Sequence, residues 1–144
     1  MQQAIGGQDG FVRLADGEDL VEALGLLPVK SGVILCGIGM VRDAMLGYWD
    51  GNEYVGRALE APAELLSLQG NIAFHGSERV VHAHVSIADA EGTVWGGHLM
   101  AATVHNTAEI ALRISSEILL ERVEDEEGRL VLRPSMRHVG GDGD

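Results

Sequence analysis

Three of the chain's six histidines lie in one short segment, VHAHVSIADAEGTVWGGHLM, which runs from residue 81 to residue 100. Neutral imidazole is a common ligand of zinc, nickel, copper and iron ions. Three converging imidazoles would hold such an ion at metal–nitrogen distances of about 2.0–2.1 Å and leave one position open for water or a substrate. His82, His84 and His98 are therefore candidate ligands of a divalent metal, with zinc as the first choice.

The first two histidines share one face of an expected strand. Residues alternate in character from Val80 to Ala88, and successive side chains of a strand point to opposite faces. His82 and His84 fall on the polar face, roughly 7 Å apart along the strand. The opposite, core-facing set comprises Val81, Ala83, Val85 and Ile87.

A tight turn is expected to bring the third histidine opposite the second. Residues 89–93, DAEGT, suit a three-residue hairpin loop in which Gly92 takes the left-handed conformation. Counted from that turn, His84 and His98 face each other directly, with Cβ atoms roughly 5 Å apart. A different turn would shift the register by one residue and turn His98 toward the core. The favoured register also places on the core face Trp95 and Leu99.

Residues that could support a metal site are few, and the sequence assigns none of them a catalytic role. Glu64 and Glu109 are carboxylates in apolar segments, so either could orient a metal-bound histidine or act as a base on bound water. An exposed position would explain each equally well. Arg42 is a lone cation in GMVRDAMLGYWD that could hold an anionic ligand or form a structural ion pair. An alternative interpretation is that no metal binds here and that each histidine only forms hydrogen bonds on a half-buried face.

The charge balance limits the partners. The chain carries 22 Asp and Glu against 10 Lys and Arg, for a net charge of −12. Proteins that bind DNA by themselves usually gather a basic patch, and no run of Lys or Arg occurs here. DNA and anionic membranes are therefore disfavoured, although folding or assembly could still build a local basic patch.

Further features point to a cytoplasmic protein. The first ten residues, MQQAIGGQDG, lack the basic and apolar regions of a signal peptide. No apolar stretch reaches the roughly 20 residues of a membrane span. Cys36 is the single cysteine, and its apolar surroundings, GVILCGIGM, predict a small buried side chain.

The pattern of elements predicts one α+β domain over residues 1–144, with a mostly antiparallel sheet and one main helix. ADGEDLVEALGLLP predicts that helix, with Asp16 as its N-cap and Pro28 as its stop. Residues 103–123 favour a strand through Ile114 and helix-like structure afterwards. Residues 1–10 and 138–144 are expected to be flexible. Further strands are predicted for FVRL, GVILCGIGMV, AMLGYWD, ELLSLQGNIAF and a last segment after Gly128.

Five segments resemble the plants-and-prokaryotes-conserved (PPC) domain in its stand-alone prokaryotic form. They are GEDLVEALGLL (17–27), GIGMVRDAMLGYWD (37–50), ELLSLQGNIAF (64–74), HAHVSIADAEGTVWGGHL (82–99) and TAEIALRI (107–114). The resemblance covers roughly residues 11–115. It implies a curved, largely antiparallel sheet with a helix, and assembly as a homotrimer.

The resemblance also bears on function. In prokaryotic members the histidines of the HxH and GGH motifs look like metal ligands near a subunit boundary, which maps onto His82, His84 and His98. The family is usually labelled DNA-binding, and plant members bind DNA through appended AT-hooks, whose Arg-Gly-Arg-Pro core is absent here. The plant partner-contact segment Gly-Arg-Phe-Glu-Ile-Leu reads APAELL at 61–66, which keeps the Glu but not the Arg.

Two functions follow as hypotheses. The first is a metal-binding homotrimer with a small-ligand or metal-dependent role. The alternative is a DNA-binding or transcription-associated protein, as the family label says.

Overall fold

The computed structural model describes residues 1–137, which form nine strands and one short helix. The fold is mostly antiparallel β-sheet, as the sequence predicts. The elements in chain order are β1 (Gln2–Gly6), β2 (Asp9–Ala15), α1 (Leu20–Gly25), β3 (Gly32–Trp49), β4 (Tyr54–Leu59), β5 (Ala63–His75), β6 (Glu78–Ala88), β7 (Val94–Ile114), β8 (Ile118–Glu124) and β9 (Leu130–Met136).

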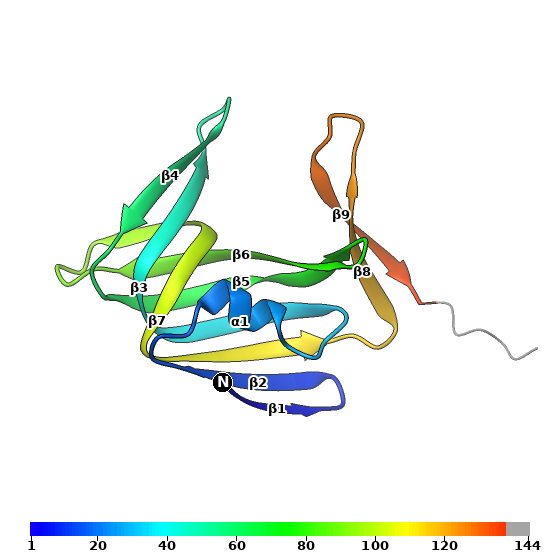
Figure 1. Ribbon diagram of the computed structural model, residues 1–144, viewed down its shortest axis with the longest axis horizontal. Helices are drawn as coiled ribbons and strands as arrows, with labels where there is room; N and C mark the ends of the chain where they lie inside the picture. The colour runs from blue at the N-terminus through cyan, green and yellow to red at the C-terminus, as the bar shows by residue number, and fades with distance from the viewer. Residues whose placement is uncertain (138–144) are drawn as a thin grey trace, which may run out of the picture.

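The strands form one strongly curved sheet (Figure 1). Its main path runs β1-β2-β7-β3-β5-β8-β9, and every pair is antiparallel except β5 with β8. Strand β6 pairs with both β5 and β7, which are themselves joined through β3. The four strands β3, β5, β6 and β7 therefore close a circuit of hydrogen-bonded neighbours, and the apolar core fills its inner side together with α1.

Helix α1 is shorter than expected and begins at a different cap. Asp19, not Asp16, caps its N-terminus, since the Asp19 side chain accepts the Glu22 backbone N–H at 2.8 Å. Asp16 instead accepts the backbone N–H of Asn106 at 2.8 Å, so it is committed to a different contact. The helix ends at Gly25, before Pro28. It buries Leu20, Ala23 and Leu24.

Strand β3 is one continuous strand where the sequence predicts two. Its partners change along its length, from β5 and β7 over the first part to β4 and β7 over the second. Irregularities in the register with β7 mark this change, and Asp43 there has a positive φ of 51°. Bulges of this kind bend a strand without ending it. The apparent break at residues 42–43 is therefore a bend.

Cys36 is exposed, which corrects the expectation that it is buried. The register between β3 and β7 slips between Ile34 and Cys36, so one extra residue is accommodated there. Leu35 and Cys36 consequently both lie on the outer side, whereas Ile34 is buried. At a bulge two consecutive residues take the same side of the sheet, so the apolar neighbours of Cys36 in the sequence do not make it buried.

The two ends of the chain also depart from expectation. Residues 1–10 are not a loose end: β1 pairs with β2 through five residue pairs. The segment after Ile114 is not helical, since β8 and β9 form a hairpin whose turn contains Gly128 with φ 75°. The expected flexible tail, residues 138–144, lies outside the described residues.

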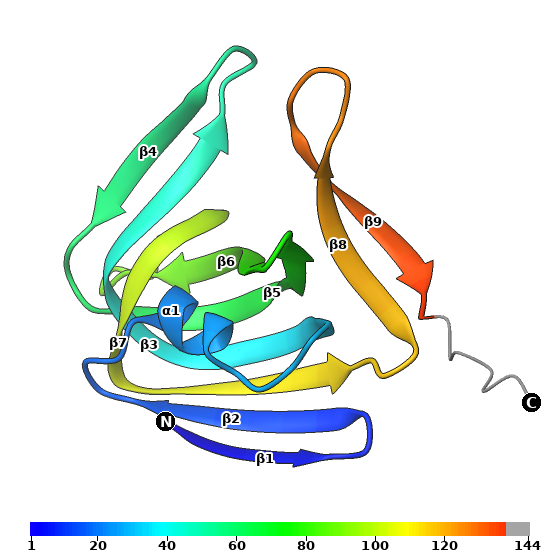
Figure 2. The same ribbon diagram turned by 45° about the vertical axis from the view of Figure 1, so that its right-hand side comes forward.

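Two hairpins project from the sheet on the same side (Figures 1 and 2). One consists of the second half of β3 with β4, and the other consists of β8 with β9. We call them the first and second arms. The two arms stand apart over the same side of the sheet (Figure 1), and residues next to both of their turns line the cavity beside the histidines.

Candidate metal centre

The β6–β7 hairpin has the turn that the sequence predicts. The Asp89 N–H donates to the Thr93 carbonyl at 3.0 Å, and the Gly92 N–H donates to the Asp89 carbonyl at 2.9 Å. Gly92 is left-handed, with φ 81°. The Asp89 carboxylate locks this turn, because it accepts N–H groups from Glu91, Thr93 and the Trp95 indole.

This turn sets the predicted register. His84 pairs directly with His98 across β6 and β7, and His82 lies two residues further along β6. The ring centroids are 5.3 Å apart for His82 and His84, 5.0 Å for His82 and His98, and 5.5 Å for His84 and His98. One nitrogen of each ring lies within 4.8 Å of the other two. The three rings therefore converge on one point.

The histidines lie on the face of β6 that points away from the core. The residues between and beside them on β6 are core-facing, which fixes the opposite direction for His82 and His84. Leu99 is buried and Trp95 packs against the core, as predicted. Gly96 pairs with Ser86, also as predicted, and leaves that neighbouring position without a side chain.

A cavity of about 250 Å³ adjoins the cluster. It lies between the two arms and β6 and β7, because Tyr54 and Leu130 border the turns of the first and second arms. It is lined by Tyr54, Val80, Val81, His82, His98, Arg122 and Leu130. His82 and His98 are half-buried in it, whereas His84 is exposed. A small molecule in this cavity would therefore reach two of the three rings.

Arg122 is a site residue that the sequence interpretation missed. Its Nη2 donates to His82 Nδ1 at 2.8 Å and to the Asn71 side-chain oxygen at 3.0 Å, and its Nη1 donates to the Leu130 carbonyl at 3.3 Å. Reading 118–124 as a strand would have been the signal, because alternation then places Arg122 on the same buried face as Leu120.

The environment favours neutral imidazoles. Burial lowers the pKa of His82 below its usual 6.5, and the Arg122 guanidinium and the other two histidines lower it further. Burial likewise lowers the pKa of His98, with smaller contributions from His84 and Arg122. A metal binds the neutral ring, so these shifts keep both rings available as ligands.

The donor set fits a divalent metal. Tetrahedral zinc with Zn–N bonds of about 2.05 Å separates its ligand nitrogens by roughly 3.3 Å. The separations here, all within 4.8 Å, are close enough for side-chain rotation to reach that geometry. In addition, His98 Nδ1 is buried and has no hydrogen-bond partner among the described residues. A buried, unpaired nitrogen is unfavourable unless something binds it.

The structure does not bring the two candidate carboxylates to the histidines. Glu64 is exposed and pairs with Met40 and Ala88, at the far end of β5 from His82. Glu109 is exposed on the outer side of β7, opposite Arg13. Within residues 1–137, no hydrogen bond or ion pair joins either carboxylate to the cluster.

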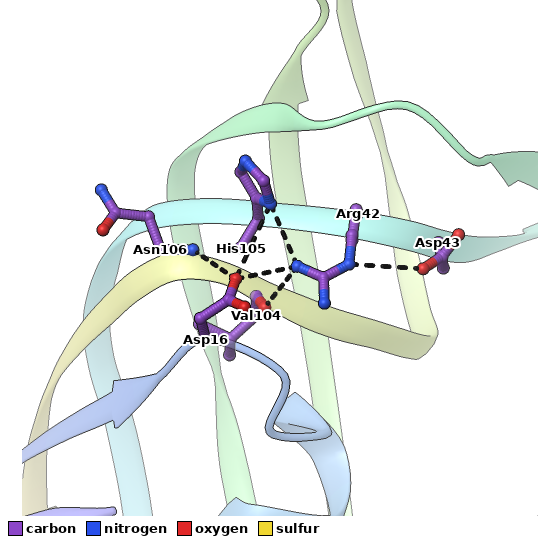
Figure 3. Close-up of polar contacts among 6 residues, drawn as sticks. All are labelled: Asp16, Arg42, Asp43, Val104, His105 and Asn106. Atoms are coloured by element: carbon purple, nitrogen blue, oxygen red, sulfur yellow. Dashed lines mark hydrogen bonds and ion pairs between the residues drawn. The ribbon is translucent and has the colours of Figure 1, made fainter.

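Arg42 belongs to a separate polar cluster (Figure 3). Its Nη1 lies 2.8 Å from the Asp16 carboxylate and 3.0 Å from His105 Nδ1, and it donates to the Val104 carbonyl at 3.2 Å. Asp43 approaches its Nε at 3.7 Å. Arg42 therefore forms an ion pair with Asp16, and neither Glu64 nor Glu109 takes part.

The comparison with known families decides the identity of the domain. The Plants and Prokaryotes Conserved (PCC) domain matches residues 1–115, from β1 to the end of β7, and so includes all three histidines. The chain belongs to the PCC domain family. PCC and PPC abbreviate the same plants-and-prokaryotes-conserved domain, so the resemblance seen in the sequence is confirmed.

Solved structures of similar proteins share the PCC fold. A plant- and prokaryote-conserved protein from Pyrococcus horikoshii is 29% identical, with a TM-score of 0.78 over 88% of this chain and 92% of that one. A metal-containing protein from Archaeoglobus fulgidus is 35% identical, with a TM-score of 0.77 over 88% of this chain and 94% of that one. A Bacteroides thetaiotaomicron protein named provisionally as DNA-binding is 21% identical, with a TM-score of 0.83 over 92% of this chain and 96% of that one.

A longer protein carries a similar segment. The bifunctional protein GlmU of a Synechococcus strain is 35% identical over 120 residues, which is 79% of this chain but only 18% of GlmU. The match therefore concerns a PCC-like part of a much longer chain. Separately, the single helix among residues 1–137 is too short to span a lipid bilayer.

Proposed function

We propose that this PCC domain is a homotrimer that binds one divalent metal ion, zinc by preference, through His82, His84 and His98 of each chain. The observation that carries the proposal is the convergence of three imidazoles, each with a nitrogen within 4.8 Å of the others, beside a cavity of about 250 Å³. The metal-containing relative from Archaeoglobus fulgidus supports it at 35% identity.

Three protein ligands would leave a coordination position for a small molecule. A metal held in this way can polarise a bound oxygen atom or lower the pKa of bound water. The chain's own contribution is to hold the rings neutral and to line the adjoining cavity. No carboxylate among residues 1–137 lines the cavity, so none is placed to act as a base there. We therefore propose a ligand-binding or metal-dependent role and name no reaction.

Metal analysis of untagged protein tests the proposal. Wild type is expected to retain about one equivalent of metal per chain, and His84→Ala is expected to lose most of it, because two imidazoles rarely hold zinc against a chelator. His105→Ala is the matched control, since His105 contacts Arg42 and Asp16 and lies outside the cluster. Equal metal content in wild type and His84→Ala would contradict the proposal.

An apolar outer surface supports assembly. Five large apolar side chains of β2, β3 and β5 are exposed, an arrangement that usually marks a protein interface. They are Phe11, Val33, Leu35, Ile38 and Leu66. A metal whose only role is to stabilise this assembly is a further alternative. Dissociation of the trimer by EDTA would favour it over a ligand-binding role.

The alternative function is direct DNA binding. We place the protein in the cytoplasm in either case, where the exposed thiol of Cys36 would stay reduced. Provisional names of two similar structures, from Ralstonia eutropha and Bacteroides thetaiotaomicron, favour DNA binding. The net charge of −12 argues against it. Titration with random duplex DNA at about 50 mM salt decides, because binding through phosphates must weaken steeply with added salt. No salt-dependent binding would exclude this function.

A further inference from the structure

Arg122 is a buried cation for which residues 1–137 supply no counter-ion. Arg122 as a whole residue is 8% exposed, and it takes part in none of the salt bridges among residues 1–137. Its acceptors are all neutral: a carbonyl, an amide oxygen and an imidazole nitrogen. Its Nε is buried without any partner. A buried charge is strongly unfavourable unless an opposite charge accompanies it, so the site lacks an anion.

The contact between Arg122 and His82 depends on whether His82 is a metal ligand. A neutral imidazole has one N–H and one lone pair. Here the lone pair on His82 Nδ1 accepts an N–H from Arg122, which leaves the proton on Nε2. A ring that binds a metal gives up that lone pair, either at Nδ1 directly or at Nε2 with the proton moved to Nδ1. In both cases Arg122 loses His82 Nδ1 as an acceptor, and one of its N–H groups is free to donate to a ligand.

We propose that Arg122 binds the carboxylate of a small apolar acid in the cavity lined by His82 and His98. The proposal rests on the proposed metal site. An arginine forms strong, charge-assisted hydrogen bonds to carboxylates, often through two N–H groups at once. Asn71 is a positioning residue, because its side-chain oxygen holds Nη2 of the guanidinium at 3.0 Å.

The rest of the cavity fits the body of such an acid. Its walls include Val80, Val81, Leu130 and the ring of Tyr54, which suit a short hydrocarbon part. Its volume of about 250 Å³ is below the range of drug-sized pockets, so the acid must be small. Phosphate would meet the same apolar walls and only one arginine. The lining therefore favours a carboxylate over an inorganic anion.

Calorimetric titration of the Co²⁺-loaded protein with butyrate tests the proposal, with 1-butanol and inorganic phosphate as comparison ligands. Wild type is expected to bind butyrate more tightly than either. Arg122→Met is expected to weaken butyrate binding about tenfold or more, the usual effect of losing a charged hydrogen bond, with Co²⁺ content unchanged. Metal-free wild type is also expected to bind butyrate more weakly, because Arg122 is then engaged with His82.

Arg133→Met is the matched control, because Arg133 pairs with Glu121 on the exposed side of the second arm. If Arg122→Met does not fold, Arg122→Lys replaces it and is expected to weaken butyrate binding several-fold, since lysine lacks the planar fork. Equal butyrate affinity in wild type and the Arg122 variant, or a preference for phosphate or butanol, would overturn the proposal. A wild type that binds no Co²⁺ would overturn the metal site itself.

Discussion

His82 and His98 share a cavity wall and differ from His84, which is exposed. Burial and neighbouring charge hold the pKa of both half-buried rings below 6.5, so protonation of either ring is disfavoured in the folded chain. This is the state that a metal requires. Because these rings are neutral in the folded chain, acid is expected to destabilise the metal-free protein.

Stability of the metal-free protein is expected to fall as the pH is lowered from about 6.5. The unfolded chain binds protons at ordinary histidine pKa values, whereas folded His82 and His98 bind them only at lower pH. Between those values the unfolded state holds more protons, so acid favours unfolding. Denaturant titrations of wild type and a His82→Gln, His98→Gln double variant at pH 7.5 and 5.5 measure this. An equal loss of stability in both proteins would contradict the assignment.

The affinity for the metal is also expected to fall as the pH is lowered, and to fall more steeply than the stability of the metal-free protein. Each ligand ring must be neutral, so protons compete with the metal at up to three positions. Competition titrations with a chelator should show affinity that is nearly constant above pH 7 and falls by more than tenfold per pH unit well below 6. An affinity independent of pH between 5 and 7.5 would exclude histidine ligands.

At the scale of elements, one turn type recurs. The β6–β7 turn DAEGT and the β8–β9 turn DEEGR both place an Asp before a left-handed Gly, and in both the carboxylate accepts N–H groups of the loop. In both turns the glycine N–H donates back to the Asp carbonyl. The first turn sets the histidine register and the second sets the hairpin that carries Arg122. Local turn chemistry therefore positions residues from both halves of the site.

Asp89→Ala is expected to loosen the histidine hairpin. It removes the acceptor of the Glu91, Thr93 and Trp95 N–H groups. We expect a Tm lower by roughly 3 °C or more and a metal affinity reduced several-fold. Asp125→Ala is the matched control, because it removes the equivalent contacts from the second arm and should lower Tm without weakening metal binding. Equal metal affinities in the two variants would show that the turn does not hold the site.

The sequence predicts those features of the elements that neighbouring residues determine, and it does not predict those that depend on residues far along the chain. The histidine register was predictable, because five consecutive turn residues determine it. Cys36 was misplaced because its apolar neighbours predict burial, whereas a bulge set by the pairing of β3 with β7 turns it to the outer side. The helix cap was misplaced because Asp16 has a partner, Asn106, that is 90 residues away. Arg122 was missed for the same reason: it reaches His82 from 40 residues along the chain.

At the scale of the whole molecule, large apolar residues are exposed on several strands. The outer face of β2, β3 and β5 carries five exposed large apolar residues, and both arms carry others, including Trp49, Tyr54 and Met136. The arms also flank the cavity, since Tyr54 and Leu130 line it. Contacts between copies at the arms would therefore affect access to the site.

Size-exclusion chromatography with light scattering is expected to give a mass of about 46 kDa, three times the 15.3 kDa of one chain. Ile38→Glu should lower that mass, because it places a charge beside Glu109 on the exposed apolar face. Leu26→Glu is the control, since Leu26 is even more exposed than Ile38 (67% against 57%) but lies at the end of α1. A monomeric wild type would contradict the assembly.

The most direct test of the three-histidine metal site is an anomalous difference map from crystals of the untagged protein, recorded on both sides of the zinc absorption edge. We expect one peak per chain, about 2.0–2.1 Å from a nitrogen of each of His82, His84 and His98. No peak at that place, with the three rings turned away from one another, would contradict the proposed metal centre.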